Sequence, residues 1–209
     1  KLADLFIVII GITVAFQLNN WNDIRKARQE RRTYLESFRQ ENTDNQESLN
    51  AILSKAQGMQ ADMDSLERIL QRKDFGNEQI EALSLVLLKL VSFSPTTATM
   101  DNITYSGDFN LIQDPELSRM ILSTYKSFTS IEEVEELTAG YEKNYVAPFF
   151  FNELTGSMYD NLESYPKEVA QLIKLNTVEE GLIRQQVECY QQSLQQMAVL
   201  DSMLMAAIP

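Results

Sequence analysis

Four carboxylates stand close together at Glu132, Glu133, Glu135 and Glu136, and the first and last share a helix face at a spacing of four residues. Paired carboxylates can bind a metal ion or exchange protons. The di-iron helical bundles, however, combine their glutamates with a histidine three residues further on, and this chain contains no histidine. Acidic side chains in the first turns of a helix also offset the macrodipole. We therefore expect a solvated acidic helix start here and predict no metal site.

Two Ser-x-x-Lys sequences, Ser123 to Lys126 and Ser164 to Lys167, match the spacing with which a lysine assists a serine nucleophile in penicillin-recognising enzymes. The companion Ser-Asp-Asn and Lys-Thr-Gly sequences do not occur. Without histidine, a Ser-His-Asp triad or a Cys-His dyad is excluded. The sequence thus predicts a protein that is not an enzyme and has no catalytic residues. A hydrolase working with carboxylates alone remains an alternative, and it needs two of them in one cleft with perturbed pKa values.

The composition restricts the other classes of function. The chain has 209 residues, a formal net charge of −12 and one cysteine. A single cysteine excludes an intrachain disulfide and a cysteine metal cluster, and we expect Cys189 to be a small core residue. A chain this acidic is a poor nucleic-acid binder, because neutralising phosphates needs a basic surface. We therefore predict no cofactor and no nucleic-acid partner.

The most apolar stretch of the chain is residues 2–18, LADLFIVIIGITVAFQL, of which fourteen are apolar or glycine. As a helix it would span roughly 26 Å, just short of a bilayer core of about 30 Å. The chain begins with Lys1 rather than methionine, so we expect it to continue upstream and complete the span. Trp21 follows at the position of an interfacial aromatic anchor. We predict that residues 1–21 form a transmembrane helix.

A signal peptide and a buried core helix are the alternatives for this stretch. A signal peptide ends in a small-residue cleavage site, whereas Gln-Leu-Asn-Asn-Trp follows here. A core helix would carry one polar stripe, whereas residues 6–12 are apolar on all sides. Gly11 and Ala15 form a pair of small residues four apart, through which two membrane helices could approach closely.

A basic cluster follows the apolar run and bears on membrane orientation. Residues 1–32 carry a net charge of +3 and residues 33–209 a net charge of −15. Taken alone, the cluster would place the C-terminal side in the cytoplasm, although the rule compares two flanks and the upstream flank is not in view. Contacts with lipid headgroups or a solvated helix face are the alternatives. The cluster consists of Arg25, Lys26, Arg28, Arg31 and Arg32.

From Trp21 to Leu70, one seam of residues recurs in alternating steps of three and four over seven heptads. This pattern predicts a helix from about residue 22 to 72, roughly 75 Å long, and we assign residues 22–75 to a coiled-coil-like stalk. Two asparagines of the seam either fix register and oligomer number or mark a hydrated section. The seam residues that we expect to pair with another helix include Leu35, Phe38, Asn42, Asn45, Leu49 and Ile52.

Residues 76–209 are predicted to form a helical body. We expect short helices over about 77–91 and 97–105, and Asp114 followed by Pro115 favours a helix start there. Ser130 with Glu133 and Asn176 with Glu179 have the spacing of capping pairs, which predicts further helix starts at 130 and 177. Residues 108–112 are the best candidate for an extended segment. The predicted fold is therefore all-α, with the last helix antiparallel to the stalk and shorter helices covering one side.

Two stretches resemble a known family. Residues 11–23, GITVAFQLNNWND, resemble the G-I-x-x-A-x-Q-I-N-N-W-N-E membrane-exit signature of an uncharacterised bacterial single-pass membrane family, with Asp23 where glutamate is usual. Residues 106–117, SGDFNLIQDPEL, are similar to its S-G-x-x-x-L-I-x-x-x-x-L segment. The resemblance implies a basic cytoplasmic tail upstream, a helix in the bacterial inner membrane and a periplasmic helical body. It implies no activity and no catalytic residues.

Together these patterns predict a non-enzymatic, membrane-anchored scaffold or accessory subunit of a membrane complex. It would act through helix association with copies of itself or another integral membrane protein. We expect Gly11, Ala15, Trp21, Arg25 and Lys26 to provide the membrane contacts. The alternative is an extracytoplasmic ligand-sensing domain, which predicts an internal pocket near residues 105–112.

Overall fold

The computed structural model describes residues 2–208, with side chains from Ile10 onward, and within that range it is all-helical. The prediction of an all-α fold is therefore confirmed. The elements in chain order are α1 (Leu2–Gln71), α2 (Gln79–Ser84), the 3₁₀ turn η1 (Leu85–Leu88), α3 (Ala98–Ser106), the 3₁₀ turn η2 (Asp108–Leu111), α4 (Pro115–Tyr141), the π-helical turn η3 (Glu142–Val146), α5 (Ala147–Asn152), the 3₁₀ segment η4 (Gly156–Ser164) and α6 (Pro166–Ala207).

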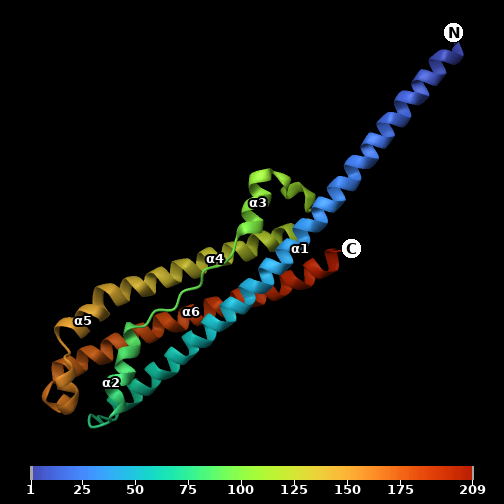
Figure 1. Ribbon diagram of the computed structural model, residues 1–209. Helices are drawn as coiled ribbons and strands as arrows, with labels where there is room; N and C mark the ends of the chain where they lie inside the picture. The colour runs from blue at the N-terminus through green and yellow to red at the C-terminus, as the bar shows by residue number, and fades with distance from the viewer. Residues whose placement is uncertain (1, 209) are drawn as a thin grey trace.

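Three long helices build the body, and α6 packs against both α1 and α4 (Figure 1). The side-chain amide of Asn42 in α1 donates to the carbonyl of Met197, 2.9 Å away. Further along α1, the carbonyl of Met63 accepts from the amide of Asn176 at 3.1 Å. Residues further along α1 thus contact residues earlier in α6, so the two helices are antiparallel. The predicted packing of the last helix against the long first helix is confirmed.

The heptad seam of α1 supplies one wall of the core. Leu49, Met63 and Leu66 are fully buried and pack in one cluster with residues of α4 and α6. A second cluster joins Leu35 and Phe38 to α3, α4 and the end of α6. Each such side chain contributes roughly 1.5–3 kcal/mol of transfer free energy when it is removed from water. Residues 35–70, which we assigned to a stalk, therefore share their core with the helical body.

The predicted helix starts have different outcomes. Asp114 is the N-cap of α4, where its Oδ1 accepts the backbone N–H groups of Glu116 at 2.8 Å and Leu117 at 3.3 Å. The predicted start at Ser130 is wrong, because α4 continues unbroken from residue 115 to 141. Phe128 and Ile131 are both buried in the core on either side of Ser130, so tertiary packing holds this stretch in one helix.

The start predicted at residue 177 is also wrong. Helix α6 begins eleven residues earlier, with Pro166 in its first turn, and Asn176 and Glu179 are buried inside it. A capping pair and a pair of buried polar residues have the same spacing, so the sequence pattern alone did not distinguish them. Proline is favourable at a first helical position because its missing N–H needs no partner there.

The connections between the long helices also depart from expectation. The helix expected over 77–91 ends with η1 at Leu88, and residues 89–97 run in an irregular, extended path to α3. Residues 108–112 are not extended, because most of them form η2. Gly107 links α3 to η2 with φ of 77°, a left-handed conformation that favours glycine. The π-helical turn η3 lies directly before Pro148, where a regular helix would clash with the proline ring.

The first part of α1 extends away from the body (Figure 1). We name residues 10–24 the projecting segment, and every one of them is exposed. Among the described residues, no helix combines the length and apolar character needed to cross a membrane. The transmembrane helix was predicted over residues 1–21. The side chains of residues 1–9 lie outside the described part of the structure, which includes side chains from Ile10 onward.

Candidate functional site

The irregular connection of residues 89–97, which we name the strap, is fastened by polar side chains of α1 and α4. Asn45 clamps Thr96, since its amide nitrogen donates to the Thr96 carbonyl and its oxygen accepts the Thr96 N–H, both at 2.8 Å. Glu135 accepts the N–H of Phe93 at 2.9 Å. Glu41 accepts the N–H of Thr99 at 2.8 Å, just beyond the strap. These buried side chains thus supply partners to backbone that no strand or helix satisfies.

A tyrosine donates to each of the two carboxylates. Tyr190 donates to Glu135 at 2.6 Å, and Tyr125 donates to Glu41. Burial, followed by the hydrogen bond to its glutamate, raises the pKa of each tyrosine far above the usual value. The phenols therefore keep their protons and act as donors, so each tyrosine and glutamate pair holds the strap and does not exchange protons.

The acidic residues of α4 are divided between two environments. Glu135 is 9% exposed and bonded as described above, whereas Glu132, Glu133 and Glu136 point to solvent. The prediction of an acidic helix start is wrong, because all four lie in the middle of α4. Glu132, Glu135 and Glu136 line one hollow of about 250 Å³ beside Leu90 and Ser92. Glu135 is held there by Phe93 and Tyr190, so its carboxylate serves as a hydrogen-bond acceptor in the packing.

The first Ser-x-x-Lys pair lines a shallow pocket of about 250 Å³ beside Cys189. Ser123 donates to the backbone carbonyl of Met120 at 3.0 Å, so its proton is directed at the helix backbone. Burial, and then the charge of Glu135, raises the pKa of the Cys189 thiol. Both groups are therefore poor nucleophiles in this arrangement.

The sequence pattern assigned Glu179 only a role in capping a helix and did not predict that it is buried. It is 0% exposed, and neither carboxylate oxygen has a hydrogen-bond partner among the described residues. Burial, and then the charge of Glu142 in η3, raises its pKa to about 8. Its position between Leu175 and Ile183, each four residues away and both buried, was the signal that could have placed it on the core face.

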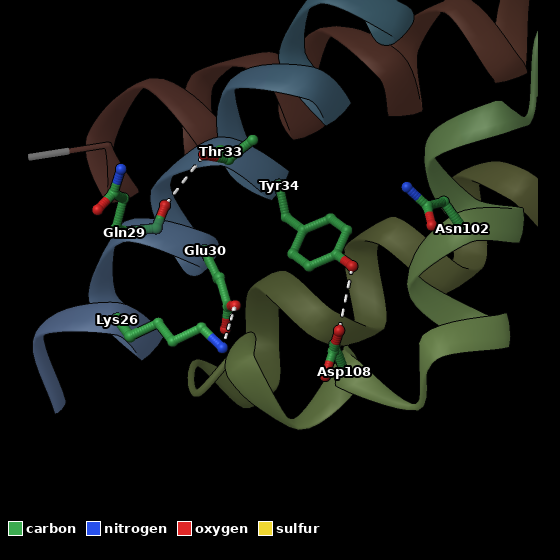
Figure 2. A pocket seen from close by; sticks show the side chains of 7 residues that line it. All are labelled: Lys26, Gln29, Glu30, Thr33, Tyr34, Asn102 and Asp108. Atoms are coloured by element: carbon green, nitrogen blue, oxygen red, sulfur yellow. Dashed lines mark hydrogen bonds and ion pairs between the residues drawn. The ribbon is translucent and has the colours of Figure 1, made fainter. Parts of the chain in front are cut away.

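A hollow lies where α1 meets α3 and η2, and Figure 2 shows it from close by. Its volume is about 450 Å³, and it opens to solvent at the base of the projecting segment. Tyr34 reaches across to Asp108 and donates to its Oδ2 at 3.2 Å. On the α1 side, Lys26 pairs with Glu30 at 3.7 Å. The lining residues are Lys26, Gln29, Glu30, Thr33, Tyr34, Asn102 and Asp108.

The residues predicted to pair with another helix are used within the chain. Leu35, Phe38 and Leu49 are at most 1% exposed, and Ile52 is partly buried against the same core. Asn42 and Asn45 are 4% and 3% exposed and bond to backbone of α6 and the strap. Their partners are thus supplied by the same chain, which leaves this face covered.

The residues predicted to contact a membrane lie on the projecting segment and at its end. Nothing described lies within 4 Å of the position that a Cβ atom would take on Gly11, and Ala15 is exposed. Trp21 is 62% exposed, and the Arg25 guanidinium lies 5.8 Å from the centre of its ring. Lys26 begins the wall of the hollow. The structure therefore brings together Trp21 and Arg25, whereas Lys26 pairs with Glu30 at the hollow and Gly11 and Ala15 lie nearer to the N-terminus of α1.

These features define an all-α protein in which one helix of 70 residues serves both as a core element and as a bare extension. Residues 4–162 match a family of unknown function, DUF6090, and the chain belongs to that family. Neither the curated proteins nor the solved structures contain a match to it. The resemblance noted in the sequence is thus confirmed as membership of a family of unknown function, while the membrane signature and the bacterial origin remain predictions.

Proposed function

We propose that this protein is a non-enzymatic, membrane-anchored scaffold or accessory subunit, with α1 as the anchor of the helical body. The observation that carries the proposal is the contrast along α1. Ile12, Phe16 and Leu18 are 61–72% exposed on the projecting segment, whereas the same helix is core from Leu35 onward. Exposed apolar area favours transfer out of water by about 25 cal/mol per Å². The large apolar side chains of the projecting segment therefore favour contact with an apolar partner that covers them.

The sequence of the apolar run favours a bilayer as that partner. Residues 5–18 contain no charged side chain, and Trp21 follows them as an interfacial aromatic anchor would. With the residues that precede Ile10, the run reaches nearly the length of a bilayer core. Following the family resemblance, we place the anchor in a bacterial inner membrane with the body in the periplasm.

Association with other proteins then falls to the anchor and the body surface. The seam residues are covered by α6 and the strap, so a second copy cannot pair through them without opening the core. Gly11 and Ala15 remain open on the anchor, and small residues four apart let helices approach closely in lipid. The partner is a second copy or another integral membrane protein.

Two experiments test this function. Flotation of the full chain with phospholipid vesicles should be lost in the Ile12→Asp/Phe16→Asp variant. It should be retained in a matched Leu137→Asp/Val199→Asp variant, whose sites are exposed apolar positions on the body. A wild-type chain that stays below the vesicles would contradict the anchor.

The second experiment is the intact mass of the complex purified from native membranes in mild detergent. A multiple of the chain mass means a homo-oligomer, and stoichiometric additional polypeptides mean an accessory subunit. A lone monomer would contradict the role in association.

Extracytoplasmic ligand sensing is the second candidate, and the hollow in Figure 2 favours it. Asn102 and Asp108, in or beside the region where a pocket was predicted, line it together with the base of the anchor helix. A small polar ligand there would contact both α1 and the η2 region, and so could bias their packing. A ligand-dependent rise in melting temperature that is lost in Tyr34→Phe/Asp108→Ala would support sensing. The absence of any shift across a library of small polar compounds would count against it.

A further inference from the structure

A stripe of side chains at the end of the projecting segment combines an aromatic ring with cations. Trp21, Arg25 and Arg28 follow one another in steps of four and three residues, so they share one face of α1. All three are exposed. The Arg25 guanidinium lies 5.8 Å from the centre of the Trp21 ring. The Arg25 side chain therefore extends back along the helix toward the apolar run. The two arginines thus stand next to the last apolar anchor residues.

The direction of these side chains follows from helix geometry. In an α-helix the Cα–Cβ bond tilts toward the N-terminus, so a long side chain covers the turn that precedes it. Arg25 does this over Trp21, and Arg28 begins one turn later on the same face. The Arg25 guanidinium is accordingly directed toward the apolar end of α1, and helix geometry favours the same direction for Arg28.

Neither Arg25 nor Arg28 forms an ion pair with any acidic side chain that the structure describes. The acids nearby have other partners: Asp23 accepts from Asn19 at 3.3 Å, and Glu30 pairs with Lys26 at 3.7 Å. Arg32, the next residue of the stripe, pairs with Glu36 at 2.8 Å. Two guanidinium groups therefore remain available for an anion beside the lone tryptophan of the chain.

We propose that Trp21, Arg25 and Arg28 form a binding site for the phosphate of an anionic phospholipid on the body side of the membrane. The site rests on the proposed membrane anchor. Arg25 begins about 10 Å and Arg28 about 15 Å beyond Leu18 along the helix axis. The headgroup layer on one side of a bilayer is about 5–8 Å thick. Side chains that reach back toward the N-terminus meet lipid phosphates at this depth, and guanidinium groups bind phosphate through paired N–H donors.

Charge separation along the chain makes an anionic lipid the best-fitting partner. The arginine stripe lies in the part of the chain with a net charge of +3, and residues 33–209 carry −15. An anionic bilayer surface attracts the stripe and repels the body. Binding at the stripe therefore also holds the body away from the membrane, with α1 as the connection.

The single tryptophan supplies the reporter for a test. The full chain is reconstituted into phosphatidylcholine vesicles that contain either dansyl-labelled phosphatidylglycerol or dansyl-labelled phosphatidylcholine at equal density. Energy transfer from Trp21 should be stronger to the anionic probe. Arg25→Gln and Arg28→Gln should each lower this preference by about fivefold, since a basic residue near an anionic surface contributes about 1 kcal/mol. In 1 M salt, where the Debye length is about 3 Å, the preference should largely disappear.

Matched variants separate this site from net charge and from anchoring. Lys143→Gln and Lys174→Gln each remove the same single charge from an exposed position of the body and should leave the preference unchanged. Arg25→Lys/Arg28→Lys keeps the charge but loses paired donors, and should give an intermediate preference. Equal transfer to both probes, with Trp21 emission still shifted to the blue by the bilayer, would overturn the lipid site and leave the anchor intact. No blue shift and no flotation in either vesicle would overturn both.

Discussion

The projecting segment and residues 35–70 belong to one uninterrupted helix, yet they stand in opposite environments (Figure 1). On the projecting segment, large apolar side chains such as Phe16 and Leu18 are 72% and 61% exposed. Further along, polar side chains such as Asn42 and Asn45 are 4% and 3% exposed. The apolar residues are left uncovered and the amides lie in the core, because the described chain supplies a covering partner only to the second region.

This contrast shows what a heptad pattern specifies. The spacing fixes which side chains share a face of the helix, and it does so equally in both regions. It does not specify whether the facing element comes from the same chain, from another protein or from a bilayer. In residues 35–70 the facing elements are α6, the strap and part of α4; beside the projecting segment, the described part of the chain provides none.

The largest expected effect comes from truncating the same residue type in the two regions. Leu49→Ala should lower the free energy of unfolding by about 2–5 kcal/mol, because it opens a cavity at a fully buried site. Leu18→Ala should change it by less than about 0.5 kcal/mol, because that side chain is 61% exposed. Urea unfolding followed by circular dichroism measures both, in detergent-free buffer. A similar loss in the two variants would mean that the projecting segment packs against something in solution.

Glu179 tests the rule that buried polar groups of the body need partners. Its folded pKa of about 8 lies above the ordinary value of 4.5, so the folded state binds the proton more tightly than the unfolded state does. The contribution of Glu179 to stability is therefore greatest at low pH and falls as the pH rises from about 4.5 through 8, at up to about 1.4 kcal/mol per pH unit. Between pH 5 and 8 the loss from this group is about 3 kcal/mol.

The comparison variant Glu179→Gln removes the titrating group and should flatten this part of the stability profile. Glu163→Gln removes the same charge from an exposed position and should leave the slope unchanged. Denaturant midpoints at several pH values give the slopes. Parallel profiles for the wild type and Glu179→Gln would show that Glu179 reaches water when it ionises.

The strap predicts a smaller difference between two asparagines of α1. Asn45→Ala removes both hydrogen bonds to Thr96 and leaves partly buried backbone groups unpaired, which costs about 2 kcal/mol. Asn50→Ala removes one exposed bond to the carbonyl of Gln46 and should cost less than about 0.5 kcal/mol. Both substitutions gain the same helix propensity, so the difference between their free energies of unfolding reports the two hydrogen bonds between Asn45 and Thr96. Amide hydrogen exchange at Thr96 should accelerate in Asn45→Ala alone, and equal exchange in both variants would argue against it.

The regular elements were the predictable part of the fold. Asp114 followed by Pro115 marks the start of α4 because capping geometry is local, and the long heptad run marks α1 because helix periodicity is local as well. The spacing at Ser130 and at Asn176 is identical to that of a cap, yet both lie inside helices. Only the tertiary packing of residues such as Phe128 and Leu175 resolves that ambiguity.

The candidate site was predictable in part. Trp21, Arg25 and Lys26 follow an apolar run, and this order in the sequence is enough to predict an aromatic and basic group at its end. Glu41 and Glu135 are ordinary acids in the sequence, and their roles depend on a strap that lies near them only in three dimensions. The sequence predicted an internal pocket near residues 105–112, whereas the hollow opens to solvent and only Asp108 of that region lines it. Its other wall comes from α1, and Tyr34 and Asp108 are 74 residues apart in the chain.

The smallest expected effect asks whether α1 unfolds as one unit. Gly11 and Gly58 are both exposed helical positions, and nothing described lies within 4 Å of the Cβ that an alanine would add at either. Alanine is favoured over glycine in a helix by about 1 kcal/mol. Gly58→Ala should therefore raise the free energy of unfolding of the body by about 0.5–1 kcal/mol.

Gly11→Ala should leave the same quantity unchanged in solution, because a helical segment without tertiary partners frays independently of the core. Far-ultraviolet circular dichroism and the urea midpoint distinguish the outcomes: Gly11→Ala adds helical signal that melts before the main transition, and Gly58→Ala shifts the transition itself. In membranes the situation changes, since a bilayer removes water from the backbone of an inserted helix and enforces its hydrogen bonds. A rise in the midpoint for both variants in buffer would show that the two regions are coupled without a membrane, and that the contrast along α1 lies in exposure alone.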